Sequence, residues 1–550
     1  MKLFPKKSDR SPSAVFLCLL VLSGALAEAC LAQELRPMQG FRYPLEFYPD
    51  NRLKTQIIAE EVIPSTGQED IHARRVRVES FDTEGVANGL IRADDCRFSR
   101  EKGMLWSDSN VLLDRDGIRI SGKGFAWTLK IQKLILRQDV EVVFSGARQT
   151  PSESSPSVPG LSTLFGPGIG TNQTRITAVT LDFDYRKMQG VFEKRVLVKS
   201  GETQLSSDKL TASFAGTNEL RTVEAEGNVE ILYSDGKGLC RRAAYEAETG
   251  LLILTGGAVL HRARNTIAAE RIAVGVRESA VRTMKAVGKV RCDLDTALAP
   301  GAEGNTGKSE VPAEGGIPGK MIRPSGPVSI ECDTLIGRMG GSNELQSIEA
   351  DGRVAIRQGD GMGKGRKVTY DGTTGVVTLT GDAVLRRGDD AVTADRIIFQ
   401  AMDGELRSMD ASGKVRCSFA NAANTKGSLI RAGSAEGPTP LRMDSNRLIA
   451  AFGGTNGLES VDAIGDVRIS QGEAQGTGQR ASHDTVSGRV VLSGSAELNR
   501  PGESVSAETI SFVIRENDVR SIKASGHAQL RYTGTRAPAI RKPDKTGRAG

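Results

Sequence analysis

The chain has 550 residues, with 73 basic and 67 acidic side chains and a formal net charge of +6. This length exceeds what one hydrophobic core supports, so we expect several domains. Glycine is abundant, at 63 residues, and aromatic residues make up only 5%, which is typical of a soluble protein of short strands and turns. The small basic surplus hints at anionic partners but is mainly a solvated surface, and we expect no nucleic-acid partner.

The first 32 residues have the pattern of a secretory signal. Basic residues precede an apolar run, Ala14–Leu26, and small residues follow it. The run of 13 residues is shorter than the ~20 that a membrane-spanning helix needs. We therefore predict cleavage after Ala29 or Ala32. An uncleaved anchor and a lipid on Cys30 are the alternatives.

Three internal stretches rich in Pro, Gly, Ser and Ala lack apolar periodicity and are predicted to be linkers: 146–173, 296–326 and 420–440. A basic tail of similar composition occupies 534–550. The sequence between them predicts four modules, at 41–145, 174–295, 327–419 and 441–533.

One block of sequence occurs three times without a gap, at Asn218–Gly288, Asn343–Gly413 and Asn456–Gly526. The spacing between copies differs, and the difference falls in the linkers rather than in the block. Ungapped copies are typical of one supersecondary unit that is stacked several times.

Within the block, apolar and polar residues alternate as in strands with one buried face. Ala225, Gly227, Val229 and Ile231 alternate with glutamate and asparagine, and the other copies repeat the pattern. No window beyond the signal has the 3.6-residue period of a helix, so we predict an all-β fold. Hairpin turns are predicted at equivalent places in the three copies: Thr249–Gly250, Thr374–Gly375 and Ser487–Gly488.

Each inner strand face has Gly or Ala at its middle and larger aliphatic residues at its ends. The glycines of the first copy, Gly227, Gly256 and Gly288, have two interpretations. Either two curved sheets meet tightly at these glycines, or the small residues leave a slot between sheets that open like a V. Cys292 and Cys417 fall on the same face, and we predict that they are small buried hydrophobic residues.

Residues for catalysis or metal binding are scarce. The five cysteines beyond the signal form no CxxC pair, and the four histidines have no metal-ligand spacing. His483–Asp484 is predicted to flank a turn. Gly361–Gly365 lacks the Lys-Ser/Thr ending of a phosphate loop and is predicted to be a polar hairpin tip. We therefore predict a protein that is not an enzyme and has no cofactor or metal.

The repeats and turns by themselves are compatible with two classes of protein that do not transport lipid. A structural or adhesive secreted β-repeat protein without lipid cargo is the main alternative, although solenoid coils usually repeat every ~20–30 residues. A β-helical polysaccharide enzyme is the other, and it would need a cluster of acidic or basic groups that the sequence does not display.

Several short segments of the block resemble those of a known family. Ala225–Val229, Tyr245–Glu246, Leu254–Gly256 and Ile267–Ile272, with their counterparts in the other copies, resemble the OstA-like repeat of the LptA family, periplasmic carriers in lipopolysaccharide transport. The segment 41–144 is similar to the related LptC family, for example at Tyr43-Pro44, Asp50-Asn51 and Gly122–Trp127. Together the two resemblances cover 41–145 and 174–533.

The resemblance implies tandem twisted β-jelly-roll modules stacked along one axis, with two sheets that open along one side. It implies a periplasmic bridge, either free or anchored to the inner membrane. This bridge would carry lipopolysaccharide from an inner-membrane ABC-type export complex to an outer-membrane assembly protein. The resemblance also allows end-to-end self-association. The lipid A acyl chains would lie in an apolar groove between the sheets. The aliphatic residues expected to line this groove are Val229, Ile231, Leu254, Leu260, Val354, Ile356, Leu379, Leu385, Val467, Ile469, Leu492 and Leu498.

Overall fold

The computed structural model describes residues 37–63, 70–99, 101–115, 117–128, 131–144, 174–215, 219–233, 236–277, 280–295, 327–340, 345–402, 405–419, 440–453, 458–484, 486–515 and 518–532. The predicted signal and C-terminal tail lie outside these ranges, as do the three predicted linkers except for Pro440. Every regular element in the described ranges is a β-strand. They contain no helix long and apolar enough to cross a membrane. The prediction of an all-β fold is confirmed.

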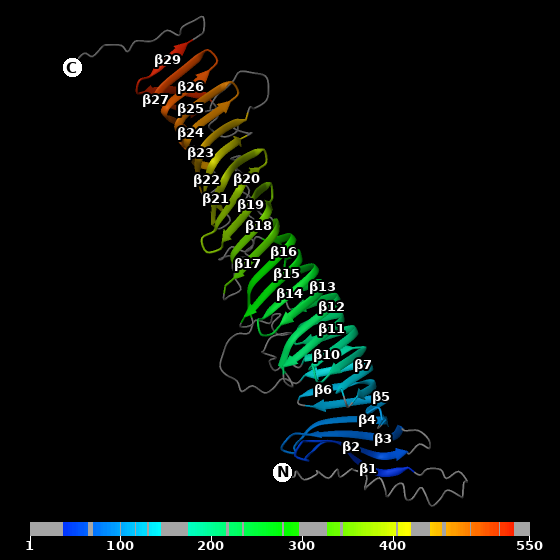
Figure 1. Ribbon diagram of the computed structural model, residues 1–550. Helices are drawn as coiled ribbons and strands as arrows, with labels where there is room; N and C mark the ends of the chain where they lie inside the picture. The colour runs from blue at the N-terminus through cyan, green and yellow to red at the C-terminus, as the bar shows by residue number, and fades with distance from the viewer. Residues whose placement is uncertain are drawn as a thin grey trace, which may run out of the picture. The chain divides into compact units, whose positions relative to one another are not determined.

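The chain divides into two compact units, which are described separately (Figure 1). Unit 1 comprises Met1–Val142 and Thr180–Lys187, and unit 2 comprises Val143–Val179 and Met188–Gly550. The strands of unit 1 are β1 (Met38–Phe47), β2 (Leu53–Ile63), β3 (Asp70–Phe81), β4 (Ala87–Ser99), β5 (Met104–Arg115), β6 (Ile118–Thr128), β7 (Lys133–Phe144, except its last two residues) and β9 (Thr180–Asp184).

Unit 2 holds the three copies of the block. Its strands are β8 (Thr174–Ala178), β10 (Gln189–Ser200), β11 (Thr203–Ala215), β12 (Glu219–Tyr233), β13 (Gly236–Glu246), β14 (Leu251–Arg262), β15 (Asn265–Arg277), β16 (Ala280–Leu294), β17 (Val328–Met339), β18 (Leu345–Gln358), β19 (Gly361–Asp371), β20 (Val376–Arg387), β21 (Asp390–Met402), β22 (Glu405–Phe419), β23 (Leu441–Phe452), β24 (Leu458–Gln471), β25 (Ala474–Asp484), β26 (Arg489–Arg500), β27 (Glu503–Arg515), β28 (Asp518–Ser525) and β29 (Gln529–Tyr532).

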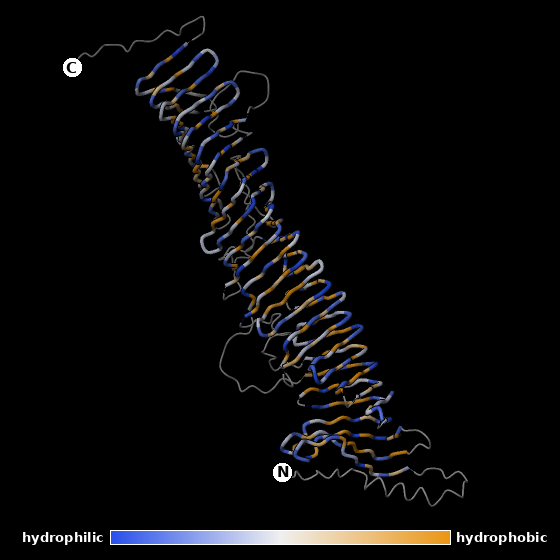
Figure 2. The backbone as a smooth tube through the Cα atoms, viewed as in Figure 1, coloured by the Kyte–Doolittle hydropathy of each residue, from blue (hydrophilic) through white to orange (hydrophobic). Residues whose placement is uncertain are grey.

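Strands pair with their neighbours in the sequence, and the pairing is antiparallel. In unit 1, β1 to β6 pair in succession and β7 pairs with β9. In unit 2, β8 pairs with β10, β10 to β28 pair in succession, and β29 pairs with β27. Hydrophobic and hydrophilic residues alternate along these strands (Figure 2). The predicted turns are confirmed, because β13, β19 and β25 each pass to the next strand at the Thr-Gly or Ser-Gly position.

A β-bulge interrupts each even-numbered strand from β12 to β26, at a glycine and the residue after it, and a ninth bulge lies between β28 and β29, opposite β27. In β12, Glu226 pairs with Arg242 and Val229 with Cys240, so Gly227 and Asn228 lie opposite a single residue. Both have positive φ, +77° at the glycine and +46° at the asparagine. The other bulges begin at Gly256, Gly288, Gly352, Gly381, Gly413, Gly465, Gly494 and Gly526.

The bulges correct the expectation that these glycines lie on the inner face. A Cβ at the first bulge position would lie only 2.6–3.0 Å from the Cβ of the polar residue beside it on the preceding strand, for example Asp208 beside Gly227 or Asp333 beside Gly352. That distance is too short for a side chain, and positive φ also favours glycine. The second bulge position varies among the copies, and at Gly257 an added Cβ would meet nothing within 4 Å. The glycines therefore allow the bulge and leave no slot.

The bulges fold the sheet upon itself. Leu254 pairs with Ala243 of β13, yet its Cδ1 lies 3.8 Å from the position that a Cβ on Gly238 of the same strand would occupy. Along a straight strand, the five residues between Gly238 and Ala243 would span ~17 Å, far beyond the reach of a leucine. The strands must therefore bend at the bulges, so that the two halves of each strand face one another.

Leu379 over Gly363 and Leu492 over Gly476 repeat this contact in the other copies, at 3.1 Å each. The two layers of each jelly-roll module are thus the two halves of the same bent strands.

The prediction that Gly361–Gly365 forms a hairpin tip is wrong. This segment opens β19, and the turn before it is at Gly359 and Asp360.

Candidate functional site

The inner face of unit 2 carries two continuous rows of apolar residues, one on each half of the bent sheet. The deep row passes from Phe192 in β10 through Leu254, Leu379 and Leu492 to Ile510 in β27. These five residues are at most 2% exposed. The deep row is therefore core.

The rim row lies on the other half, and each member pairs directly with the next. Because no member carries a charge, the rim row is a continuous nonpolar strip across eighteen strands, β10 to β27. Its members are Val198, Leu205, Ile231, Gly238, Leu260, Ile267, Cys292, Ile330, Ile356, Gly363, Leu385, Val392, Cys417, Met443, Ile469, Gly476, Leu498 and Val505.

All twelve residues predicted to line a groove point to this inner face. Leu254, Leu379 and Leu492 belong to the deep row, and the three valines follow the bulges directly: Val229, Val354 and Val467. The remaining six belong to the rim row: Ile231, Leu260, Ile356, Leu385, Ile469 and Leu498. Nine of the twelve are buried, and Leu260, Ile356 and Leu385 are half-buried.

The inner face is more accessible in the second copy of the block than in the other two. Ile356 is half-buried, whereas its counterparts Ile231 and Ile469 are buried. On the opposite half, Val377 and Phe399 are also half-buried, although their counterparts are buried in the first copy (Leu252 and Val274) and in the third (Val490 and Phe512). Both halves are thus accessible at β18–β21.

A pocket opens between the two halves at β24–β27. It is small, with a cavity volume of about 20 Å³, which is room for about one water molecule. Rim-row residues Ile469 and Leu498 line it together with Leu492, Phe512 and Arg500. The arginine is the one charged lining residue, and sequence reasoning did not identify it.

The cysteines behave as core residues. Cys292 and Cys417 are 1% and 4% exposed, as predicted, and Cys96, Cys240 and Cys332 are buried as well. Burial raises the pKa of the Cys292 and Cys417 thiols to about 12, so neither is an active nucleophile at neutral pH. His483 is the second-last residue of β25 and lies near a turn, as predicted, and burial lowers its pKa.

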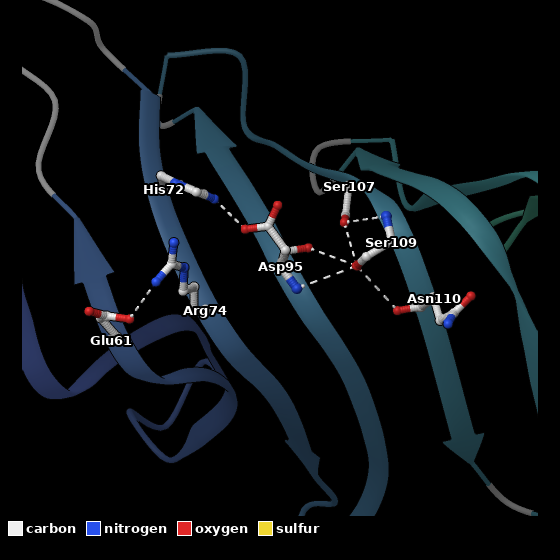
Figure 3. A network of polar contacts seen from close by, with 7 residues as sticks. All are labelled: Glu61, His72, Arg74, Asp95, Ser107, Ser109 and Asn110. Atoms are coloured by element: carbon white, nitrogen blue, oxygen red, sulfur yellow. Dashed lines mark hydrogen bonds and ion pairs between the residues drawn. The ribbon is translucent and has the colours of Figure 1, made fainter.

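A polar network of unit 1 is shown in Figure 3. His72 contacts the carboxylate of Asp95, while the Ser109 hydroxyl bonds the backbone of Asp95 at 3.2 Å and the Ser107 hydroxyl at 2.8 Å. The serines therefore satisfy backbone groups at a bulge in β5 rather than forming a chain with the histidine. Among the described residues, no group of three or more His, Cys, Asp or Glu side chains is placed to hold a metal.

These features define an all-β protein with an apolar interior between two halves of a bent sheet. A family model described as LptA/(LptD N-terminal domain) LPS transport protein matches residues 175–279, 319–405 and 439–518. The chain therefore belongs to this lipopolysaccharide transport family, as its repeats indicated.

Two solved structures give weaker similarities. LptH of Pseudomonas aeruginosa, the LptA-homologous periplasmic component of the lipopolysaccharide transport device, is 18% identical over 21% of this chain and 82% of its own, with a TM-score of 0.19. A TcdB2-TccC3 structure without its hypervariable C-terminal region is 7% identical over 87% of this chain and 34% of its own, with a TM-score of 0.08. No curated protein matches the chain.

Proposed function

We propose that the chain is a non-catalytic bridge that carries lipopolysaccharide across the periplasm, with the acyl chains held against the rim row. The observation that supports this proposal is the continuity of the rim row across the three copies. A carrier that passes a lipid along its length needs such an unbroken nonpolar surface.

The energetics of lipid transfer favour this role. Each exposed CH₂ costs ~0.8 kcal/mol in water, so one acyl chain of about twelve carbons costs on the order of 10 kcal/mol. A lipid with several chains therefore does not cross an aqueous space unaided. Ile356, Leu385, Val377 and Phe399 are half-buried, which supports β18–β21 as the part of the inner face that acyl chains would contact most readily.

The proposed partners follow from the family. The chain would receive lipopolysaccharide from an inner-membrane ABC-type export complex and deliver it to an outer-membrane assembly protein, in a periplasmic location reached through the predicted N-terminal signal. Residues 41–145 would act as an LptC-like module, and the segments 174–295, 327–419 and 441–533 as LptA-like modules.

Photo-crosslinking at adjacent residues of opposite faces tests the groove. A crosslinker at Ile356 or Leu385 is expected to capture lipopolysaccharide in cells. The matched controls are Ala355 and Val384, which precede them in the same strands and face outward. Equal labelling at both faces, or none at either, would contradict the proposal and favour a structural β-repeat protein without cargo.

A further inference from the structure

Each copy of the block carries an arginine at the same place on the edge of the inner face. Arg262, Arg387 and Arg500 each follow a rim-row leucine by two residues and end β14, β20 and β26. The pairing is regular from the leucine to the strand end, and residues two apart in a strand point to the same face. Each arginine side chain therefore lies on the same face of the sheet as that leucine. Each therefore stands on the inner face beyond the rim row, at the mouth between the two halves.

Arg500 shows most directly what such a residue can do. It lines the pocket of β24–β27 beside Ile469 and Leu498, and its Nε is buried without a hydrogen-bond partner among the described residues. A guanidinium in an apolar setting is costly unless an acceptor satisfies it. The pocket therefore combines a nonpolar interior with a buried donor that an acceptor from outside the protein would satisfy.

Arg387 has two acidic neighbours: Asp390 lies directly opposite it in β21, and Asp360 lies in the neighbouring turn. Its Nε lies 3.6 Å from Asp360 of the neighbouring turn, and the two side chains are 50% and 68% exposed. Exposed pairs at this distance are readily exchanged for a stronger acceptor. An incoming phosphate could replace the aspartate at the mouth of the second copy.

Three basic residues on the outer face provide a matched comparison. Arg242, Lys367 and Arg480 occupy equivalent positions in the three copies, and each contacts an acidic residue on the adjacent strand: Glu224, Glu349 and Asp462. Their charge is thus balanced within the sheet. The outer residues form a matched set of three positive charges that face away from the interior.

We propose that Arg262, Arg387 and Arg500 are three equivalent contact sites for the phosphate groups of a phosphorylated glycolipid whose acyl chains lie against the rim row. This inference rests on the proposed function and names the headgroup chemistry that the site selects. A guanidinium binds phosphate through two parallel hydrogen bonds, which fixes orientation as well as charge. Successive arginines are six strands apart, ~29 Å at ~4.8 Å per strand, so each serves a separate lipid or a separate step of one lipid.

Binding of lipid A by the full chain tests the inference. The probes are bisphosphorylated lipid A and the same lipid without its phosphates, in mixed micelles of fixed composition. The wild type should bind the phosphorylated lipid at least about tenfold more tightly, as the loss of a charge-assisted hydrogen bond predicts. The variant R262Q/R387Q/R500Q should lose this preference and keep its affinity for the dephosphorylated lipid.

The control variant is R242Q/K367Q/R480Q, which removes the same charge from the outer face and should retain the preference. A variant with lysine at the three mouth positions should be intermediate, because lysine keeps the charge without the planar fork. Thermal unfolding of each variant verifies that it is folded.

Three results would overturn the inference. The first is full preference in the mouth variant, and the second is an equal loss of preference in the control. The third is binding of inorganic phosphate alone to the wild type as tightly as the phosphorylated lipid, which would make the arginines a site for free anions. Failure of the wild type to bind either lipid would instead overturn the proposed function, and with it this inference.

Discussion

Alanine substitution at the two adjacent glycines of the β14 bulge should have unequal effects. Gly256 and Gly257 have similar backbone conformations, with φ of +81° and +75°. An alanine at either position pays the cost of the left-handed region, ~1–2 kcal/mol. Only at Gly256 would the new Cβ meet a neighbour, the Cβ of Arg241 at 2.7 Å. Relief of that overlap adds ~1–3 kcal/mol.

Gly256→Ala should therefore destabilise this part of the sheet by ~1–3 kcal/mol more than Gly257→Ala, which is about 5- to 150-fold in the opening equilibrium. Hydrogen–deuterium exchange of peptides covering β13–β15 measures this difference locally, without assuming that the whole chain unfolds in one step. Gly257→Asp, which copies the residue at Asp382 of the second copy, should behave like Gly257→Ala. Equal protection in the two alanine variants, or weaker protection in Gly257→Ala, would refute the explanation of why the first bulge residue is glycine.

Three further outcomes are expected. Leu379→Ala should cost ~3 kcal/mol, because the side chain is fully buried over Gly363, whereas Leu385→Ala in the half-buried rim row should cost ~1 kcal/mol; local exchange at β18–β21 compares them. Burial lowers the pKa of His483, so as the pH drops below ~6.5 the unfolded state takes up a proton at this residue more readily than the folded state. Stability should therefore fall in this range. Thermal unfolding measures this effect, which should be lost in His483→Tyr. Cys292, whose pKa is raised to about 12, should react with a thiol reagent in denaturant but not in the folded protein.

The alternation of residues predicted the strands, their buried face and the buried cysteines, but it could not reveal the bulges. In β12, Ala225 and Val229 are four residues apart and both point inward, as they would in a strand without a bulge. The alternation of apolar and polar residues therefore looks unbroken in the sequence. The partner strand does carry a signal. In β13 the buried residues are Gly238 and Cys240, then Ala243 and Tyr245. The step of three residues between Cys240 and Ala243 shifts the buried positions from even to odd numbers, and it falls opposite the bulge.

The periodicity of the sequence could not predict the common position of the three mouth arginines. Arg262, Arg387 and Arg500 lie in segments that contain other charged residues, and in the sequence they resemble ordinary strand ends. Their common place depends on the strand register and on the bend that brings the two halves of the sheet together. The repeat spacing placed the residues in equivalent positions, whereas only the pairing showed that this position lies at the edge of an apolar interior.

The residues on either side of the second and third predicted linkers pair directly with one another, Cys292 with Ile330 and Cys417 with Met443. The ladder of strands thus continues from one copy to the next, whatever the length of chain between them. Growth of such a protein by duplication is therefore modular: each added repeat, which is a copy of the block with the strand before it, contributes six strands and lengthens the apolar strip by ~29 Å. The span that the protein can cover is set by the number of copies, while the pairing within each copy is left unchanged.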